Sequence, residues 1–156
     1  MALYLVRHAQ ALGRSGWDGP DELRPLSHRG ERQAAGLVEL LSHADVRRVL
    51  SSPAVRCIAT VQPLATKLGL DVKPAPELAE GAGGKGALEL LRELAAKKGD
   101  SVLCTHGDII PEVLRALARD GVKLLDEFRW AKGSTWVLDG PDGQITEARY
   151  LPPPDR

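Results

Sequence analysis

The chain opens with Met1-Ala-Leu-Tyr-Leu-Val-Arg-His-Ala-Gln-Ala11, an apolar run that ends in an arginine and a histidine. The residues from Ala2 to Val6 are strand formers and predict a β-strand. In an open α/β sheet, ligands bind in the crevice outside the carboxyl ends of the strands. The sequence therefore predicts that this strand places the Arg7 guanidinium and the His8 imidazole where a ligand would bind.

Strand-like and helical segments alternate through the rest of the chain. Strands are predicted over residues 46–50, 71–73 and 101–105, and helices over residues 28–42, 53–68, 87–97 and 108–119. A hairpin is predicted from residues 135–138 and 144–150. The alternation indicates a three-layer α/β/α sandwich with a mostly parallel mixed sheet and a C-terminal antiparallel hairpin.

Serines and prolines mark several element boundaries. Ser27 is the predicted N-cap of the first helix, and Ser52 that of the second, with Pro53 at the first helical position. Pro63 inside the second helix predicts a kink or a break, because proline removes a backbone donor. Residues 128–130 form a candidate short edge strand.

The composition excludes several classes of function. Lys and Arg number 21, as do Asp and Glu, and 4% of residues are aromatic, so the chain lacks the basic footprint of a protein that binds nucleic acid polymers. No apolar run reaches the ~18 residues of a membrane span, and no signal peptide is recognisable, so a cytoplasmic protein is expected. Cys57 and Cys104 are expected to be buried free thiols. The 156 residues fit one domain over 1–151, with an extended Pro-rich tail over 152–156.

Polar residues follow three of the predicted strands directly. They are Arg7-His8 after the first, Ser51-Ser52 and then Arg56 after the second, and Thr105-His106-Gly107 after the strand over 101–105. A lone histidine or helix arginine is commonly structural, but two of each at one sheet edge form a concentrated positive site in a chain of zero net charge. Phosphate is the natural occupant, because the guanidinium fork binds its oxygens in bidentate fashion.

A neutral histidine in such a site has a free lone pair that can attack phosphorus. The resulting phosphohistidine is later hydrolysed by water, so one difficult step becomes two easier ones. Surrounding cations lower the pKa of the histidine and keep it neutral near pH 7. This scheme needs no metal, and Cys104 and His106 lack the further ligands of a zinc site. No metal and no cofactor are expected.

Four segments occur in a characteristic order and spacing. They are Leu5-Val6-Arg7-His8-Ala9, Pro25-Leu26-Ser27-His28-Arg29-Gly30, Leu50-Ser51-Ser52-Pro53-Ala54-Val55-Arg56 and Thr105-His106-Gly107. Together they resemble the histidine phosphatase superfamily, also called phosphoglycerate mutase-like. The small size and the Arg24-Pro-Leu-Ser27 segment resemble its SixA-like phosphohistidine phosphatase branch. The end of the chain is also similar to the phosphatase domain that follows a Nudix domain in some bacterial MutT-like proteins.

The resemblance implies a role for each matching residue. His8 corresponds to the nucleophile, and Arg7, Arg56 and His106 to the phosphate-binding pocket, to which Gly107 also belongs. These are the implied catalytic and phosphate-binding residues, together with an acid that the family usually carries in a loop.

The position of that acid stays open in the sequence. Glu80 is the best match, Glu77 is the second, and some SixA-like members have no such acid. Ala9 replaces a glycine that is frequent in the family, which the small branch tolerates. Gln10 stands where an acidic residue is often found, and the sequence does not give the sign of its effect.

The long loop over residues 9–26 is rich in Gly, Asp and Pro, and loops of this length tend to be functional. Its Ser15, Trp17 and Arg24 either line the mouth of the pocket or are simply solvated.

The expected function is a metal-independent phosphatase that forms a phosphohistidine on His8 and hydrolyses a phosphomonoester or a phosphoramidate. Larger relatives carry long capping insertions that this chain lacks, so an open pocket is expected, which suits protein phosphohistidine or a nucleotide phosphate. The alternatives are a non-catalytic module that binds phosphate or phosphoproteins, and a phosphomutase. The sequence predicts no oligomeric state.

Overall fold

A seven-stranded sheet forms the centre of the molecule, with the strand order β3-β2-β4-β1-β6-β7-β5. The structure is a computed structural model that describes residues 1–154. The strands are β1 (Ala2–Arg7), β2 (Val46–Ser51), β3 (Val72–Pro74), β4 (Asp100–Thr105), β5 (Lys123–Leu124), β6 (Thr135–Asp139) and β7 (Glu147–Leu151). The helices are α1 (His28–Leu41), α2 (Val55–Leu68), α3 (Gly84–Ala95) and α4 (Ile109–Arg119), with short 3₁₀ helices at Arg14–Gly16, Asp21–Leu23 and Pro76–Leu78.

Strand β1 is central because it pairs in parallel with β4 on one side and antiparallel with β6 on the other. Strand β2 pairs in parallel with both β4 and β3, so the carboxyl ends of these strands lie at one edge of the sheet. The register aligns Arg7 with Thr105. His8 and His106 are therefore the next residues on adjacent strands, and Ser52 follows the end of β2.

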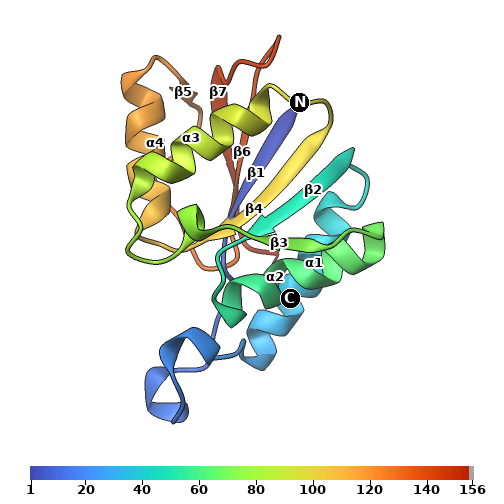
Figure 1. Cartoon of the computed structure of the whole chain (residues 1–156), viewed down its shortest axis with the longest axis vertical. Helices are drawn as coiled ribbons and strands as arrows, with labels where there is room; N and C mark the ends of the chain where they lie inside the picture. The colour runs from blue at the N-terminus through green and yellow to red at the C-terminus, as the bar shows by residue number, and fades with distance from the viewer. Residues whose placement is uncertain (155–156) are drawn as a thin grey trace.

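Helices cover both faces of the sheet (Figure 1). On one face, α3 and α4 pack over an apolar cluster that includes Leu91, Leu114 and Trp136. On the other face, α1 and α2 bury a second cluster that includes Leu37 and Leu64. Since β6 and β7 pair antiparallel, the predicted α/β/α sandwich with a mixed sheet and a terminal hairpin is confirmed.

The start of α1 holds the beginning of the loop over residues 9–26 in place. The backbone N–H of Gly30 donates to Ser27 Oγ at 3.1 Å, so the predicted N-cap is confirmed. The carbonyl of Gln10 accepts from the backbone N–H of Ser27 at 3.0 Å, and a Cβ at Gly30 would overlap that carbonyl oxygen. Gly30 therefore permits the close approach that joins the loop to the helix, and Figure 1 shows this loop projecting below the carboxyl ends of the strands.

The predicted start of α2 at Pro53 is wrong, since Ala54 is the N-cap and the helix begins at Val55. The reason is that the Ser52 hydroxyl contacts the His106 ring at 2.8 Å, and the backbone N–H of Ala54 donates to the same hydroxyl at 3.3 Å. A break at Pro63 is also wrong, because α2 runs through it. Pro63 lies on the exposed side of the helix, where water can satisfy the carbonyl left without its donor.

Residues 128–130 are not a strand, and the edge of the sheet beside β7 is formed by β5 instead. The Trp130 carbonyl accepts a hydrogen bond from the Arg7 guanidinium, so this segment is a loop that contacts the end of β1. After β7, Pro154 lies against Gly36 of α1, while residues 155–156 of the predicted tail lie outside the described residues. Within residues 1–154, no helix has the length and apolar character needed to cross a membrane.

Candidate functional site

His8 is fixed in one tautomer at the end of β1. Its Nδ1 lies 2.8 Å from the carbonyl oxygen of Ala9, and a carbonyl can only accept, so Nδ1 carries the proton. The Ala9 peptide is itself held, because its N–H donates to Thr60 Oγ1 at 2.9 Å. The side chain is 6% exposed. The lone pair of Nε2 is therefore free, on an imidazole that cannot easily turn.

The surroundings of His8 also keep it uncharged. Burial lowers the pKa of His8, and the neighbouring charges of His106, Arg56 and Arg7 lower it further, while the hydrogen bond to Ala9 opposes them. The pKa is about 3, far below the ordinary value of about 6.5. The imidazole is therefore a neutral potential nucleophile at physiological pH.

This pKa predicts a specific pH dependence of stability. Between about pH 6.5 and about pH 3 the unfolded chain binds a proton at this histidine that the folded chain does not, so stability falls as pH falls through this window. From about pH 7 to about pH 5, His8 should account for a loss of about 2 kcal/mol in the free energy of unfolding. Urea unfolding of the protein and of a His8→Asn variant measures this difference. An imidazole resonance of His8 that titrates near pH 6.5 would contradict the prediction.

His106 faces the same edge of the sheet from β4. It is 1% exposed, and its Nε2 contacts Ser52 Oγ at 2.8 Å and Cys57 Sγ at 3.5 Å. Its Nδ1 is buried and has no hydrogen-bond partner among the described residues. When the Ser52 hydroxyl donates to Nε2, Nδ1 carries the proton and can donate to a ligand.

Arg7 lies against the backbone at Gly107. Its Nη1 donates to the Trp130 carbonyl at 2.7 Å, and an added Cβ at Gly107 would lie 2.7 Å from the guanidinium carbon. Its Nε is buried without a hydrogen-bond partner, and no carboxylate pairs with it in the described part of the chain. The guanidinium is therefore held in place with its buried Nε donor unused.

Arg56 reaches the site from the first turn of α2 and is 2% exposed. Its Nη1 donates to the Asp21 carbonyl at 2.9 Å, and its Nη2 lies 3.3 Å from the Asp21 carboxylate and 3.6 Å from the Glu80 carboxylate. Its Nε, like that of Arg7, is buried without a partner among residues 1–154. Arg56 thus joins the loop over residues 9–26 to the sheet edge.

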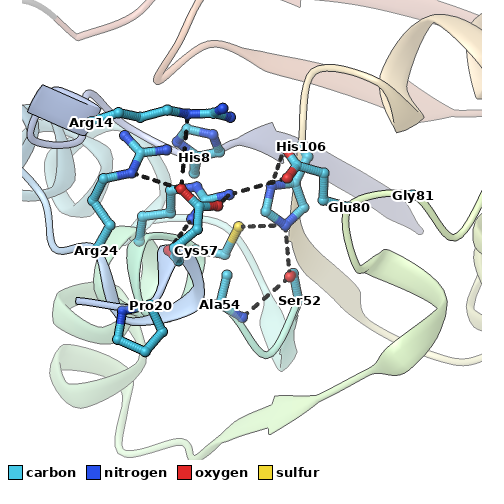
Figure 2. Close-up of polar contacts among 12 residues, drawn as sticks. His8, Arg14, Pro20, Arg24, Ser52, Ala54, Cys57, Glu80, Gly81 and His106 are labelled. Carbon is cyan, nitrogen blue, oxygen red and sulfur yellow. Dashed lines mark hydrogen bonds and ion pairs between the residues drawn. The ribbon is translucent and has the colours of Figure 1, made fainter. Parts of the chain in front are cut away.

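Glu80 lies at the site and Glu77 does not. A Glu80 oxygen is 3.9 Å from His106 Nδ1, and Figure 2 shows this carboxylate beside the His106 ring. The turn that carries it is fixed because the backbone N–H of Gly81 donates to the Asp108 carboxylate at 2.8 Å. Glu77 is exposed and lies against Gly86 of α3. Of the two candidate acids, Glu80 is therefore the one that lies at the site.

Two adjoining hollows make up the site. One, of about 300 Å³, contains His8, and the other, of about 150 Å³, contains His106. Arg56 and Glu80 line both. This arrangement can place a tetrahedral oxyanion between an uncharged imidazole and several cationic donors.

Sequence reasoning did not identify three residues that line or hold these hollows. Arg14 and Lys132 line the hollow at His8, and Asp21 accepts from Arg24 Nε at 3.1 Å while it faces Arg56. Desolvation raises the pKa of Asp21, but the hydrogen bond from Arg24 and the charges of Arg56 and Arg14 together lower it by more. Asp21 therefore stays ionised and holds cations in place. For Arg14 and Asp21, the only signal in the sequence was the length of the loop over residues 9–26. No local sequence pattern indicated Lys132.

The structure also places the other residues that the sequence singled out. Arg24 lines the hollow at His8, and Trp17 lines a further hollow beside it. Ser15 is exposed. The Gln10 side chain accepts from the Ser27 hydroxyl at 2.8 Å, so it joins the loop to α1. Ala9 is fully buried.

Cys57 and Cys104 are both buried and free, as predicted. Among residues 1–154, no group of three or more His, Cys, Asp or Glu side chains lies in a metal-binding arrangement.

Comparison with known proteins gives one family match and several relatives. The family described as the histidine phosphatase superfamily (branch 1) matches residues 3–87, a range that includes Arg7, His8, Arg56 and Glu80. The 8-oxo-(d)GTP phosphatase of Mycolicibacterium smegmatis is 37% identical over 154 residues, which are 97% of this chain and 48% of that protein. The chain thus spans about half the length of this curated relative.

Solved structures share the fold. The protein histidine phosphatase SixA complexed with tungstate superposes with a TM-score of 0.76 at 18% identity, over 99% of this chain and 97% of that one. A mycobacterial glucosyl-3-phosphoglycerate phosphatase superposes with a TM-score of 0.68 at 21% identity, over 96% of each chain. At these identities the likeness concerns the fold.

Proposed function

This chain belongs to the histidine phosphatase superfamily, and we propose that it is a metal-independent phosphatase that works through a phosphohistidine on His8. His8 is the nucleophile of this proposal, and Arg7, Arg56 and His106 bind the phosphoryl group with the backbone at Gly107. Glu80 is the proposed proton donor.

The observation that carries the proposal is that the site combines buried hydrogen-bond donors that have no partner with the free lone pair of His8 Nε2. Arg7 Nε, Arg56 Nε and His106 Nδ1 are buried and lack hydrogen-bond partners within residues 1–154. Buried polar groups normally have partners, and each one left unsatisfied costs about 1–3 kcal/mol. A phosphoryl group beside His8 Nε2 would offer oxygens to such donors. Charge on those oxygens in the transition state is what the donors would stabilise.

In the first step, His8 Nε2 attacks phosphorus and a P–N bond forms. The bond to the leaving group breaks, and the leaving group takes the electron pair and a proton from Glu80. In the second step, water attacks the phosphohistidine, the P–N bond breaks, and its electron pair returns to Nε2. The Glu80 carboxylate takes the proton that the water loses, which restores the starting state.

The substrate of this reaction is a phosphomonoester or a phosphoramidate, and protein phosphohistidine and a nucleotide phosphate are the favoured candidates. Both suit a site whose hollows are lined in part by exposed side chains such as Asp21 and Glu80. The nucleotide candidate is also supported by the relative named 8-oxo-(d)GTP phosphatase.

Hydrolysis of p-nitrophenyl phosphate, measured with and without a metal chelator, tests the proposed function. We expect turnover with the same kcat and KM in both assays, because Arg7 and Arg56 supply the positive charge that a metal supplies elsewhere. Loss of turnover with the chelator would contradict the metal-independent scheme. Binding of phosphate without any turnover would support a binding module instead.

A pair of glutamate variants tests the proton donor. Glu80→Gln should lower kcat by about 100-fold on an alkyl phosphate, whose leaving group needs a proton, and by less on p-nitrophenyl phosphate. Glu77→Gln is the matched control, since Glu77 is exposed outside the site, and it should leave both rates unchanged. Equal, small effects of the two substitutions would remove Glu80 from the mechanism.

A further inference from the structure

Lys132 is held beside His8 by the backbone of its own loop. The N–H of the next residue, Gly133, donates to the carbonyl of His8 at 3.0 Å and to that of Arg7 at 3.1 Å. The Lys132 side chain lines the same hollow of about 300 Å³ as His8. A residue that follows β1 by more than a hundred positions in sequence is thus part of the phosphoryl site.

The hollow holds more positive charge than one phosphoryl group requires. Five cationic side chains line it, which are Arg7, Arg14, Arg24, Arg56 and Lys132. Asp21 faces three of the arginines and Glu80 faces Arg56. In the described part of the chain, no carboxylate pairs with Lys132. After a dianionic phosphoryl group binds, an unmatched ammonium is left beside it.

This ammonium lies among like charges. Desolvation lowers the pKa of Lys132, and the charges of Arg7, Arg24 and Arg56 lower it further. Lys132 is exposed, so its ammonium is accessible to an incoming ligand at this hollow. A second anion beside it would offset the repulsion from the neighbouring arginines.

We infer that Lys132, together with Arg24 and Arg14, forms a second anion subsite that takes a phosphate group bonded to the one transferred to His8. The substrate class is therefore a phosphoanhydride with a terminal phosphate. This inference rests on the proposed function and deepens it. It favours the nucleotide candidate over protein phosphohistidine, whose imidazole leaving group carries no second phosphate to bind Lys132.

The chemistry of the anhydride balances at this site. His8 Nε2 forms a bond to the terminal phosphorus, and the bond from that phosphorus to the bridging oxygen breaks. The bridging oxygen keeps the electron pair and leaves as part of the second phosphate, whose new negative charge develops beside Lys132. Water then hydrolyses the phosphohistidine and releases orthophosphate.

The space next to this subsite fits a substrate that extends beyond the second phosphate. A further hollow, of about 410 Å³, is lined by Arg14, Arg24 and Glu80 on the side toward His8, and also by Trp17. Figure 2 shows Arg24 on the side of His8 away from His106, and the Arg14 side chain above the His8 ring. An aromatic side chain in this position offers a stacking surface to a nucleobase.

The test compares the diphosphate and the monophosphate of one nucleoside, ADP and AMP, and adds inorganic diphosphate. The variants are Lys132→Met, which keeps the side-chain length without the charge, and Lys132→Arg, which restores the charge. Lys67→Met on the exposed side of α2 is the matched control. The quantity measured is the ratio of kcat/KM for each diphosphate to kcat/KM for AMP.

We expect Lys132→Met to lower this ratio by about tenfold or more, Lys132→Arg to restore most of it, and Lys67→Met to leave it unchanged. A fall for both diphosphates supports the subsite for any phosphoanhydride, and a fall for ADP alone supports it for nucleoside diphosphates. Equal losses on AMP and on the diphosphates would overturn the second subsite.

The same assays separate this inference from the proposed function. The wild-type protein could hydrolyse AMP or p-nitrophenyl phosphate in a reaction that requires His8, while Lys132→Met leaves the ratio of kcat/KM values unchanged. In that case only the subsite is wrong. If no phosphate compound is hydrolysed at all, the proposed function itself is wrong.

Discussion

Replacement of His8 with asparagine should lower kcat/KM for p-nitrophenyl phosphate by about 10⁴-fold or more, the scale of loss when a covalent nucleophile is removed. The amide of asparagine can still donate to the Ala9 carbonyl but offers no basic nitrogen to phosphorus. Steady-state kinetics on purified protein measures the effect. Thermal unfolding near neutral pH shows whether the variant stays folded.

His28→Asn is the control for this substitution, because the His28 side chain is 96% exposed on α1. It should change neither the rate nor the midpoint of thermal unfolding. A folded His8→Asn variant that kept a tenth or more of the wild-type rate would be incompatible with a nucleophilic His8.

The second large effect is expected for the substitution Gly107→Ala, although Gly107 is not the proposed nucleophile. A Cβ at this position would lie 2.7 Å from both the carbon and Nη2 of the Arg7 guanidinium, so Arg7 must move. Displacement of one phosphate-binding cation should lower kcat/KM by about 10²- to 10³-fold, the usual cost of losing one donor to a transition-state oxyanion. The free energy of unfolding should fall by only about 1–3 kcal/mol, as for a local overpacking.

Gly16→Ala provides the comparison, because nothing lies within 4 Å of a Cβ there and its φ is not positive. It should leave both activity and stability unchanged. A Gly107→Ala protein with wild-type kcat/KM would show that the position of Arg7 against this backbone does not matter for the reaction.

The sequence predicted the arrangement of the site because strand ends are local features. An apolar run that stops at polar residues is visible in residues 1–8 and again in residues 101–106, and parallel pairing then brings the two ends together. The family that the four segments resembled is confirmed. The alternation of strands and helices was enough for the fold.

The sequence could not predict features that depend on contacts between distant segments. Ser52 was assigned to a helix start because the pattern with Pro53 is locally correct, yet its hydroxyl bonds to His106, 54 residues away. The choice between Glu77 and Glu80 depends on a turn whose N–H donates to Asp108, which local propensity cannot reveal. Lys132 follows no strand and lies in no motif, so only the folded chain places it beside His8.

The most direct test of the account is the site of phosphorylation during turnover. The protein is mixed with substrate, quenched in alkali, where phosphohistidine survives, and analysed by mass spectrometry and ³¹P NMR. Because Nδ1 of His8 is hydrogen-bonded to the Ala9 carbonyl, we expect a phosphate on Nε2 of His8 that is acid-labile and absent from His8→Asn. Phosphate on His106 or on Nδ1 of His8, or turnover without any phosphoenzyme, would contradict it.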